Sequence, residues 1–367
     1  MSRAFSLRGL GWIVLVGVLL WIPQYAGPFW LTTGLFAMSA AIGAIGLTLL
    51  VGTTGQLSLA HAFFIAVGAY GYCYFAGDSE GLISGGGLTV PSGLHLPPLL
   101  AAVLAVLLSG LVGAAFSPIA GRLKGIYLGL ASIGLVFIGL HILQNAKSIT
   151  GGFNGRDAQP FDLFGFHFAN DHPANFNVLG VPYGQFERLW YLGLILVALS
   201  AWFARGLLKH RPGRALEALR DSEIAAAVMG VNVPAYRAAA FAVSSMYAGL
   251  AGVFVALAYG RIVPESFDFL YSINFLVMIV IGGLGSVGGA VTGAVIVTAL
   301  PLVLSHYADS LPLVAAPGHP GLQAGHAAQF LYGAAVVLVL IFARDGLAGL
   351  ARSRRRPAST PLEESTA

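Results

Sequence analysis

The stretch GQLSLAHAFFIAVGAY, residues 55–70, places Gln56, Ser58 and His61 at the head of a run that is otherwise apolar enough for a lipid bilayer. A membrane helix needs roughly 20 mostly apolar residues. Runs of about this length recur along nearly the whole chain, at residues 9–23, 31–51, 57–76, 97–119, 125–144, 189–204, 238–260, 269–284, 286–305 and 329–343. The sequence therefore predicts an all-α polytopic membrane protein with about ten transmembrane helices.

Two glycines precede the polar head of this stretch. Gly52 and Gly55 predict a turn or an interrupted helix. Backbone groups that are freed at membrane depth must be buried in protein or face water. Gly55, Gln56, Ser58 and His61 are therefore candidates to line a polar path, although a hydrogen-bonded packing role is the simpler interpretation for His61.

Small residues also recur along this run at a helical spacing. Ser58, Ala62 and Ala66 lie four residues apart, which on a helix creates a smooth face where another backbone can approach closely. Tight helix packing is the plainer interpretation of these three residues.

The charge distribution predicts the orientation in the membrane. The chain is 57% hydrophobic and 9% charged, and the ten ranges contain no Asp, Glu, Lys or Arg. If the N-terminus is cytoplasmic, 15 of the 19 Lys and Arg residues fall inside. Those left outside are Lys147, Arg156, Arg188 and Arg261. The positive-inside rule then predicts that both termini are cytoplasmic.

The N-terminal run leaves one question open. Its basic start, short apolar stretch and small residues are also typical of a signal peptide, although no convincing cleavage site follows. Cys73 is the only cysteine, so no disulfide can form within the chain.

Outside the predicted spans, two segments stand out. Residues 145–188 are rich in Gly, Asn, Pro and aromatics, and we expect an outer cap of loops and short helices. Residues 205–236 are basic, favour helix and fall on the cytoplasmic side. We expect residues 1–350 to form one transmembrane domain and residues 351–367 to form a basic, disordered cytoplasmic tail.

Two glycine-rich stretches are further candidates. SITGGFNG, residues 148–155, follows the fifth predicted span and is either a surface turn or part of the path. IGGLGSVGGAVTGA, residues 281–294, joins two spans with almost no loop, and glycines at positions 285, 289 and 293 predict close packing. The path or packing candidates from these stretches are Thr150, Gly151, Gly152, Asn154, Gly155, Gly282, Gly283 and Gly285.

The cytoplasmic segment predicts a short helix between strong end signals. Asp221 or Ser222 can cap it, Gly230 suits a left-handed residue after its end, and Asn232 can begin the next helix. An interfacial linker is one interpretation, and a knob that inserts into a soluble partner is the other. We expect this helix to make surface contacts without a core beneath it.

Motifs for chemistry are missing from the sequence. It holds no P-loop, no Cys/His cluster with metal spacing and no nucleophile elbow. The only titratable groups within the predicted spans, besides tyrosines and Cys73, are His61 and His141. We expect no enzyme activity, no catalytic residue, no cofactor, no metal and no nucleic-acid partner.

Four stretches together resemble the LivM-type permease subunits of branched-chain amino-acid ABC importers. They are residues 55–70, 149–155, 218–230 and 282–294, in the family's order. The resemblance implies a fold like that of type II ABC importer permeases. It also implies that the third stretch couples to an ATPase through Arg220, Asp221, Glu223, Ala226 and Gly230. Glu223 lies seven residues before Gly230, whereas the consensus spacing of ABC permeases is six, which puts individual contacts in doubt.

The resemblance also implies the partners and the location. These are a second, LivH-like permease in a heterodimer, two cytoplasmic ATPase subunits and an extracytoplasmic solute-binding protein, in the bacterial inner membrane. A urea or short-chain amide permease is an alternative within the same class. An ion-coupled carrier or channel that uses broken helices is an alternative from another class.

Overall fold

The computed structural model describes residues 14–78, 83–84, 88–89, 93–123, 125–163, 165–169, 177–178, 181–307, 324–342 and 346–353. The main helices are α2 (Pro28–Thr54), α3 (His61–Ala76), α4 (Pro98–Arg122), α5 (Ile126–Asn145), α7 (Gln185–Lys209), α8 (Arg211–Asp221), α10 (Val233–Tyr259), α11 (Phe269–Gly282), α12 (Val287–His306) and α13 (Ala324–Phe342). Shorter helices are η1 (Ile22–Gln24), α6 (Lys147–Thr150), η2 (Gly152–Asn154), α9 (Glu223–Val228), η3 (Pro264–Phe267) and α14 (Gly346–Ser353).

Six of these helices are long and apolar enough to cross a membrane, namely α2, α4, α5, α7, α10 and α12. The other predicted spans also contain helix, but α3 has only 16 residues and α11 only 14. The number of ten crossings therefore stays a prediction.

Several helices extend beyond the predicted apolar ranges. Helix α7 runs from Gln185 to Lys209 and so includes charged residues at both ends. Helix α10 begins at Val233 because the Asn232 side chain accepts a hydrogen bond from the Ala235 backbone N–H at 3.2 Å. The predicted ranges stopped at polar residues, whereas both helices continue past them, α7 without any side-chain cap at its first residue.

The N-terminal helix packs on α7. Residues 9–13 of the first predicted span lie outside the described residues, and the described part is an apolar helix, Val14–Gln24. The Trp190 indole N–H donates to the Leu19 carbonyl at 2.9 Å, and the Tyr191 hydroxyl donates to the Leu20 carbonyl at 3.1 Å. Both bonds attach this helix to the first turns of α7.

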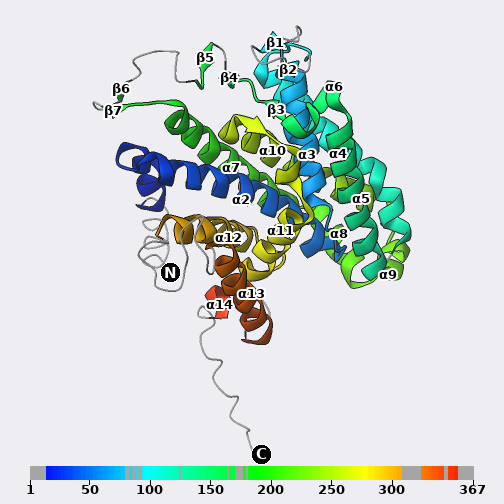
Figure 1. The fold of residues 1–367 in the computed structure, drawn as a ribbon. Helices are drawn as coiled ribbons and strands as arrows, with labels where there is room; N and C mark the ends of the chain where they lie inside the picture. The colour runs from blue at the N-terminus through cyan, green and yellow to red at the C-terminus, as the bar shows by residue number, and fades with distance from the viewer. Residues whose placement is uncertain are drawn as a thin grey trace, which may run out of the picture.

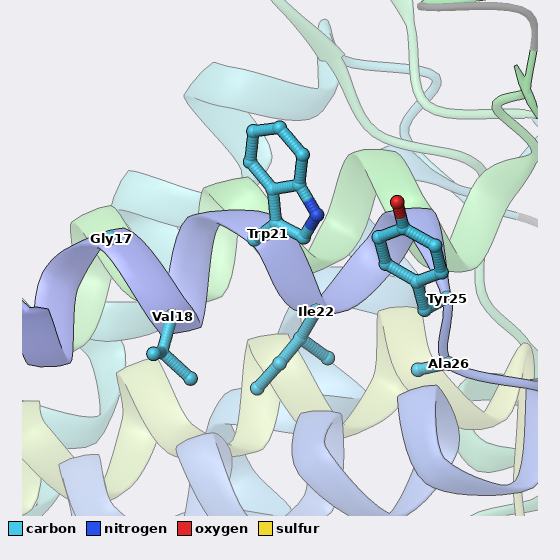
Figure 2. Close-up of a pocket in the computed structure, with 6 residues that line it drawn as sticks. All are labelled: Gly17, Val18, Trp21, Ile22, Tyr25 and Ala26. Carbon is cyan, nitrogen blue, oxygen red and sulfur yellow. The ribbon is translucent and has the colours of Figure 1, made fainter.

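An open, apolar hollow lies beside the N-terminal helix (Figure 2). The ring of Trp21 and the ring of Tyr25 rise on one side of the helix, and Val18 lies on the other. Large amphipathic rings of this kind are enriched where a membrane helix meets the headgroups. None of the predicted site residues lines this hollow.

Helices α2 and α10 form the centre of the bundle. Both are buried along most of their length, whereas a third or less of the apolar window of α4, α5, α7 and α12 is fully buried. Glycines allow the backbones to approach: Gly68 of α3 lies against the backbone of Gly249, and Gly252 lies against the Ile65 carbonyl. A membrane bundle is held largely by such close packing, because lipid gives helices no hydrophobic reason to associate.

The two ends of the bundle differ (Figure 1). One end carries three short antiparallel pairs, β1 (Ile83–Ser84) with β2 (Leu88–Thr89), β4 (Asp162–Leu163) with β5 (Phe166–His167), and β6 (Asn177–Val178) with β7 (Val181–Pro182). A fourth pair joins β3 (Arg156–Asp157) to β8 (Arg261–Ile262). Helices α8 and α9 lie at the other end. The predicted outer cap and cytoplasmic segment are thus on opposite sides.

The central contact predicts how the bundle responds to added volume. Replacing Gly252 with alanine would press a methyl group onto the Ile65 carbonyl and lower stability by about 1–3 kcal/mol, the usual cost of overpacking. Gly134→Ala on α5 is the matched control, because nothing lies near the added methyl group there. Thermal unfolding in detergent measures both, and equal midpoints for the two variants would contradict the assigned packing.

Candidate functional site

The predicted interruption between two helices lies at Gly55. Helix α2 ends at Thr54, Gly55 has a left-handed φ of 68°, and α3 begins only at His61. The prediction that Ser58 shares a helical face with Ala62 and Ala66 is wrong, because Ser58 lies in the break. Ala62 and Ala66 are buried in α3 as expected.

Serines from two other helices satisfy the backbone of the break. The Leu59 backbone N–H donates to Ser132 Oγ of α5 at 2.9 Å, and the Ala62 backbone N–H donates to Ser272 Oγ of α11 at 2.9 Å. Both serines are at most 1% exposed. Neither serine was among the residues predicted from the sequence. The only available signal was that each is a single serine within an apolar run.

The polar side chains of the break have different surroundings. His61 is buried, its Nε2 lies 2.9 Å from the Gly43 carbonyl oxygen, and its ring packs against Phe275. These contacts agree with the packing interpretation. The Gln56 side-chain oxygen is buried and has no hydrogen-bond partner among the described residues. A path-lining role for Gln56 and Ser58 stays a prediction.

The stretch SITGGFNG forms a tight turn at the far end of α3. Thr150 is buried, and its hydroxyl donates to the Ala146 carbonyl at 2.9 Å while Gly152 N–H donates back to it at 3.1 Å. Residues 151, 152 and 155 are glycines with positive φ. Gly155 also lies against the Ile262 carbonyl. The Asn154 carbonyl accepts from Arg261 Nη2 at 2.9 Å.

The next residue, Arg156, attaches this turn to α3. Its side chain is 4% exposed, Nε donates to the Cys73 carbonyl at 2.9 Å, and Nη1 donates to the Ile149 carbonyl at 2.6 Å. Burial lowers the pKa of the Arg156 guanidinium. The turn and the polar break occupy opposite ends of α3, so the structure does not bring these two predicted groups together.

The stretch IGGLGSVGG joins α11 to α12 through a close backbone turn. Gly283 and Gly285 have φ of 111° and 75°, and Ser286 Oγ caps α12 by accepting from Gly289 N–H at 3.2 Å. The predicted glycine stripe is wrong at Gly285, which precedes α12. Gly289 packs on Gly282 of α11, as close packing requires.

This turn meets the end of α2. The backbone of Gly285 lies directly against Gly52, two residues before α2 ends. Arg220 of α8 reaches the same place, where its Nη1 donates to the Gly52 carbonyl at 3.0 Å. The α2–α3 break, the α11–α12 turn and the end of α8 therefore come together.

The short helix α9 forms as the capping residues predict. Ser222 Oγ accepts from Ala225 N–H at 3.2 Å, so Ser222, rather than Asp221, is the cap. Gly230 has a left-handed φ of 85°. Asp221 instead lies 3.4 Å from Arg220 Nε, at the surface.

The expectation that α9 has no core beneath it is wrong. Ala226 is 2% exposed and packs in a cluster with residues of α2, α4, α5, α8 and α10. Glu223 forms an ion pair with Arg237 of α10, and Arg237 Nη1 donates to the Gly121 carbonyl of α4 at 3.0 Å. Glu223 therefore holds α9 in place.

Three large apolar side chains of this segment face away from the bundle. Ile224, Val228 and Met229 are 80%, 83% and 84% exposed. Residues four apart share one face of a helix. We call Ile224, Val228 and Met229 the apolar knob.

A second apolar hollow is lined by none of the predicted site residues. An apolar groove of about 320 Å³ runs between α4, α7 and α10, lined by residues such as Val103, Leu192 and Val253. Among the described residues, no group of three His, Cys, Asp or Glu side chains could hold a metal ion.

The serine contacts at the break predict a specific stability effect. Ser272→Ala would leave the buried Ala62 N–H without a partner, at a cost of about 1–3 kcal/mol. Ser305→Ala, at an exposed serine of α12, is the control. The unfolding midpoint in detergent should fall only for Ser272→Ala, and an unchanged midpoint would mean that water or another group replaces the hydroxyl.

Several known proteins are similar to this chain. The high-affinity branched-chain amino acid transport system permease protein LivM of Salmonella typhimurium is 34% identical over 300 residues, which cover 76% of this chain and 64% of the relative. LivM of Escherichia coli is 33% identical over 308 residues, which cover 78% of this chain and 66% of the relative. The matches thus span just under two thirds of these relatives' lengths. LivH of Escherichia coli is 27% identical over 273 residues, covering 73% and 82% respectively.

The family comparison covers most of the chain. No solved structure matches this chain. The model of the family described as branched-chain amino acid transport system / permease component matches residues 30–342. With this match and six helices that could cross a bilayer, the chain is a multi-pass membrane protein that belongs to the family of branched-chain amino acid transport system permease components.

Proposed function

We propose that this chain is a transmembrane permease subunit of an ATP-binding-cassette importer, and that it forms part of the translocation path for branched-chain amino acids. The observation that carries the proposal is the apolar knob, held away from the bundle by a braced helix in a chain of this family. Large apolar groups that project into water from a fixed helix are typical of a protein–protein contact.

The knob suits the ATPase as its partner. Ile224 and Val228 can enter an apolar groove, and Glu223 stays paired with Arg237 behind them. The apolar side chains, rather than Glu223, then supply most of the contact with the ATPase. Gly230 and Ala226 shape and support the helix beneath the knob.

The division of labour follows from what the spans contain. No P-loop occurs in the sequence, and the ten predicted ranges hold no acidic or basic residue. Proton-coupled transporters usually keep such a residue within the membrane despite its cost. ATP hydrolysis on two separate subunits then supplies the energy, and an outer binding protein supplies the selectivity.

The path is completed by a second permease. The predicted path residues, such as Gln56 and Gly282, line neither the hollow beside the N-terminal helix nor the groove between α4, α7 and α10. A LivH-like partner covering this chain would form a shared passage without fixed charges, which can release a zwitterion readily. Alternating access then arises as the two permeases rock against each other.

The proposal includes a membrane arrangement. The chain crosses the bacterial inner membrane ten times in a type II importer-like fold, with both termini in the cytoplasm. Residues 145–188 form the outer cap, residues 205–236 form the coupling segment, and the basic tail of residues 351–367 begins in α14 and continues outside the described residues. The 15-to-4 distribution of basic residues supports this orientation.

The knob predicts a loss of ATPase binding. Val228→Asp places a charge in an apolar contact and should weaken binding by about 1.4 kcal/mol or more, which is a tenfold loss of affinity. The measurement is the amount of ATPase that remains with the purified permease pair. Phe153→Asp, also at an exposed aromatic or aliphatic position but at the other end of the bundle, is the control. Undiminished ATPase binding by Val228→Asp would remove the coupling assignment.

The whole proposal predicts ATP-dependent uptake by the assembled complex. Proteoliposomes with both permeases, the ATPases and the binding protein should accumulate labelled leucine only when ATP is supplied to the ATPase side. Labelled urea is the comparison substrate, and its uptake in place of leucine would favour an amide permease. Accumulation by this chain alone, without ATP, would instead support an ion-coupled carrier.

A further inference from the structure

Two arginines, one in the coupling segment and one just after it in α10, contact the bundle. Arg220 and Arg237 both donate to backbone carbonyls of spans. By contrast, Arg214 on the same α8 is exposed and makes no side-chain hydrogen bond or ion pair with the described residues. A positive charge that only sets orientation needs no such partner, so the two contacts call for a further explanation.

Arg220 caps the end of α2. The last four carbonyls of a helix have no donor within the helix, and a cation near them is favoured by the helix dipole. The Val51 carbonyl accepts from Gly55 N–H, and the Gly52 carbonyl accepts from Arg220 at 3.0 Å. The Arg220 side chain also lies beside Gly55, where the break begins.

Arg237 does the same at the end of α4. Its Nη1 donates to the Gly121 carbonyl at 3.0 Å, one residue before α4 ends. Its Nη2 contacts Glu223, the first residue of α9. A guanidinium carries donors on three nitrogens in a fixed plane, so a single side chain can connect a helix end to a carboxylate.

These contacts continue into the spans. Gly52, whose carbonyl Arg220 holds, has its backbone against Gly285 in the α11–α12 turn. An apolar cluster also joins Ala226 of α9 and Leu219 of α8 to Leu50 of α2 and Phe241 of α10. The α8–α9 segment, the ends of α2 and α4 and the α11–α12 turn are therefore linked by one contiguous set of contacts.

We propose that Arg220 and Arg237 are positioning residues that transmit movement of the α8–α9 segment to the spans, Arg220 to α2 and the α11–α12 turn and Arg237 to α4. This inference rests on the proposed function. It assigns Arg220 to contacts within this chain, in place of the ATPase contact that the resemblance implies. Rigid contacts of this kind can carry coupling between sites when both ends bias the same movement.

The test measures leucine taken up per ATP hydrolysed by the complete complex in proteoliposomes. Arg220→Gln removes the charge and the fork of donors, and uptake per ATP should fall about fivefold or more, the lower range of coupling between sites. Arg220→Lys keeps the charge and one donor and should restore part of the ratio. Arg237→Gln should lower the ratio in the same way. Arg214→Gln makes the same charge change on α8 and should leave the ratio unchanged.

The outcomes separate the inference from the proposed function. If uptake and ATP hydrolysis fall in proportion in Arg220→Gln, the residue only supports the fold and the inference is overturned. The same holds if neither Arg220→Gln nor Arg220→Lys assembles with the ATPases. If the unaltered complex carries another solute with ATP, the ratio is measured with that solute, and the substrate assignment alone fails. If the unaltered complex transports nothing with ATP, the proposed function fails first and the inference with it.

Discussion

The structure depends on one constraint, the need of every backbone polar group in an apolar medium to have a partner. An unbroken helix satisfies its own groups, but α2 ends at Thr54 and α3 begins six residues after Gly55. The break is stable because the hydroxyl oxygens of Ser132 and Ser272, on two other helices, accept hydrogen bonds from its backbone N–H groups. The location of the break therefore also determines which helices must lie beside it.

Arginines meet the same need at the ends of spans. Arg156 holds the Cys73 carbonyl near the end of α3, Arg220 holds the Gly52 carbonyl of α2, and Arg237 holds the Gly121 carbonyl of α4. Arg156 lies in β3 and Arg220 in α8, whereas Arg237 lies near the start of α10 and contacts α9 through Glu223. Hydrogen bonds, in addition to the covalent chain, thus join these arginines to helix ends. A segment that moves therefore also pulls on the helix end to which it is bonded.

Much of this arrangement could be predicted from local sequence. The apolar ranges contain helices, Gly55 and Gly230 adopt the left-handed conformation, and Ser222 and Asn232 cap their helices. These features depend on residues close together in the chain. Long-range partners could not be predicted in this way: nothing near Ser272 indicates that it lies beside Ala62, and nothing near Arg220 indicates Gly52. Ser58 and Gly285 were misplaced because a spacing of four implies a helical face only where the helix continues.

The position of Cys73 has a practical consequence for study of this protein. The only thiol of the chain is fully buried near the end of α3, and its backbone carbonyl is covered by Arg156. A buried structural cysteine reacts slowly with thiol reagents. Spectroscopic probes can therefore be attached to a newly introduced surface cysteine in the native background, without first replacing the natural one.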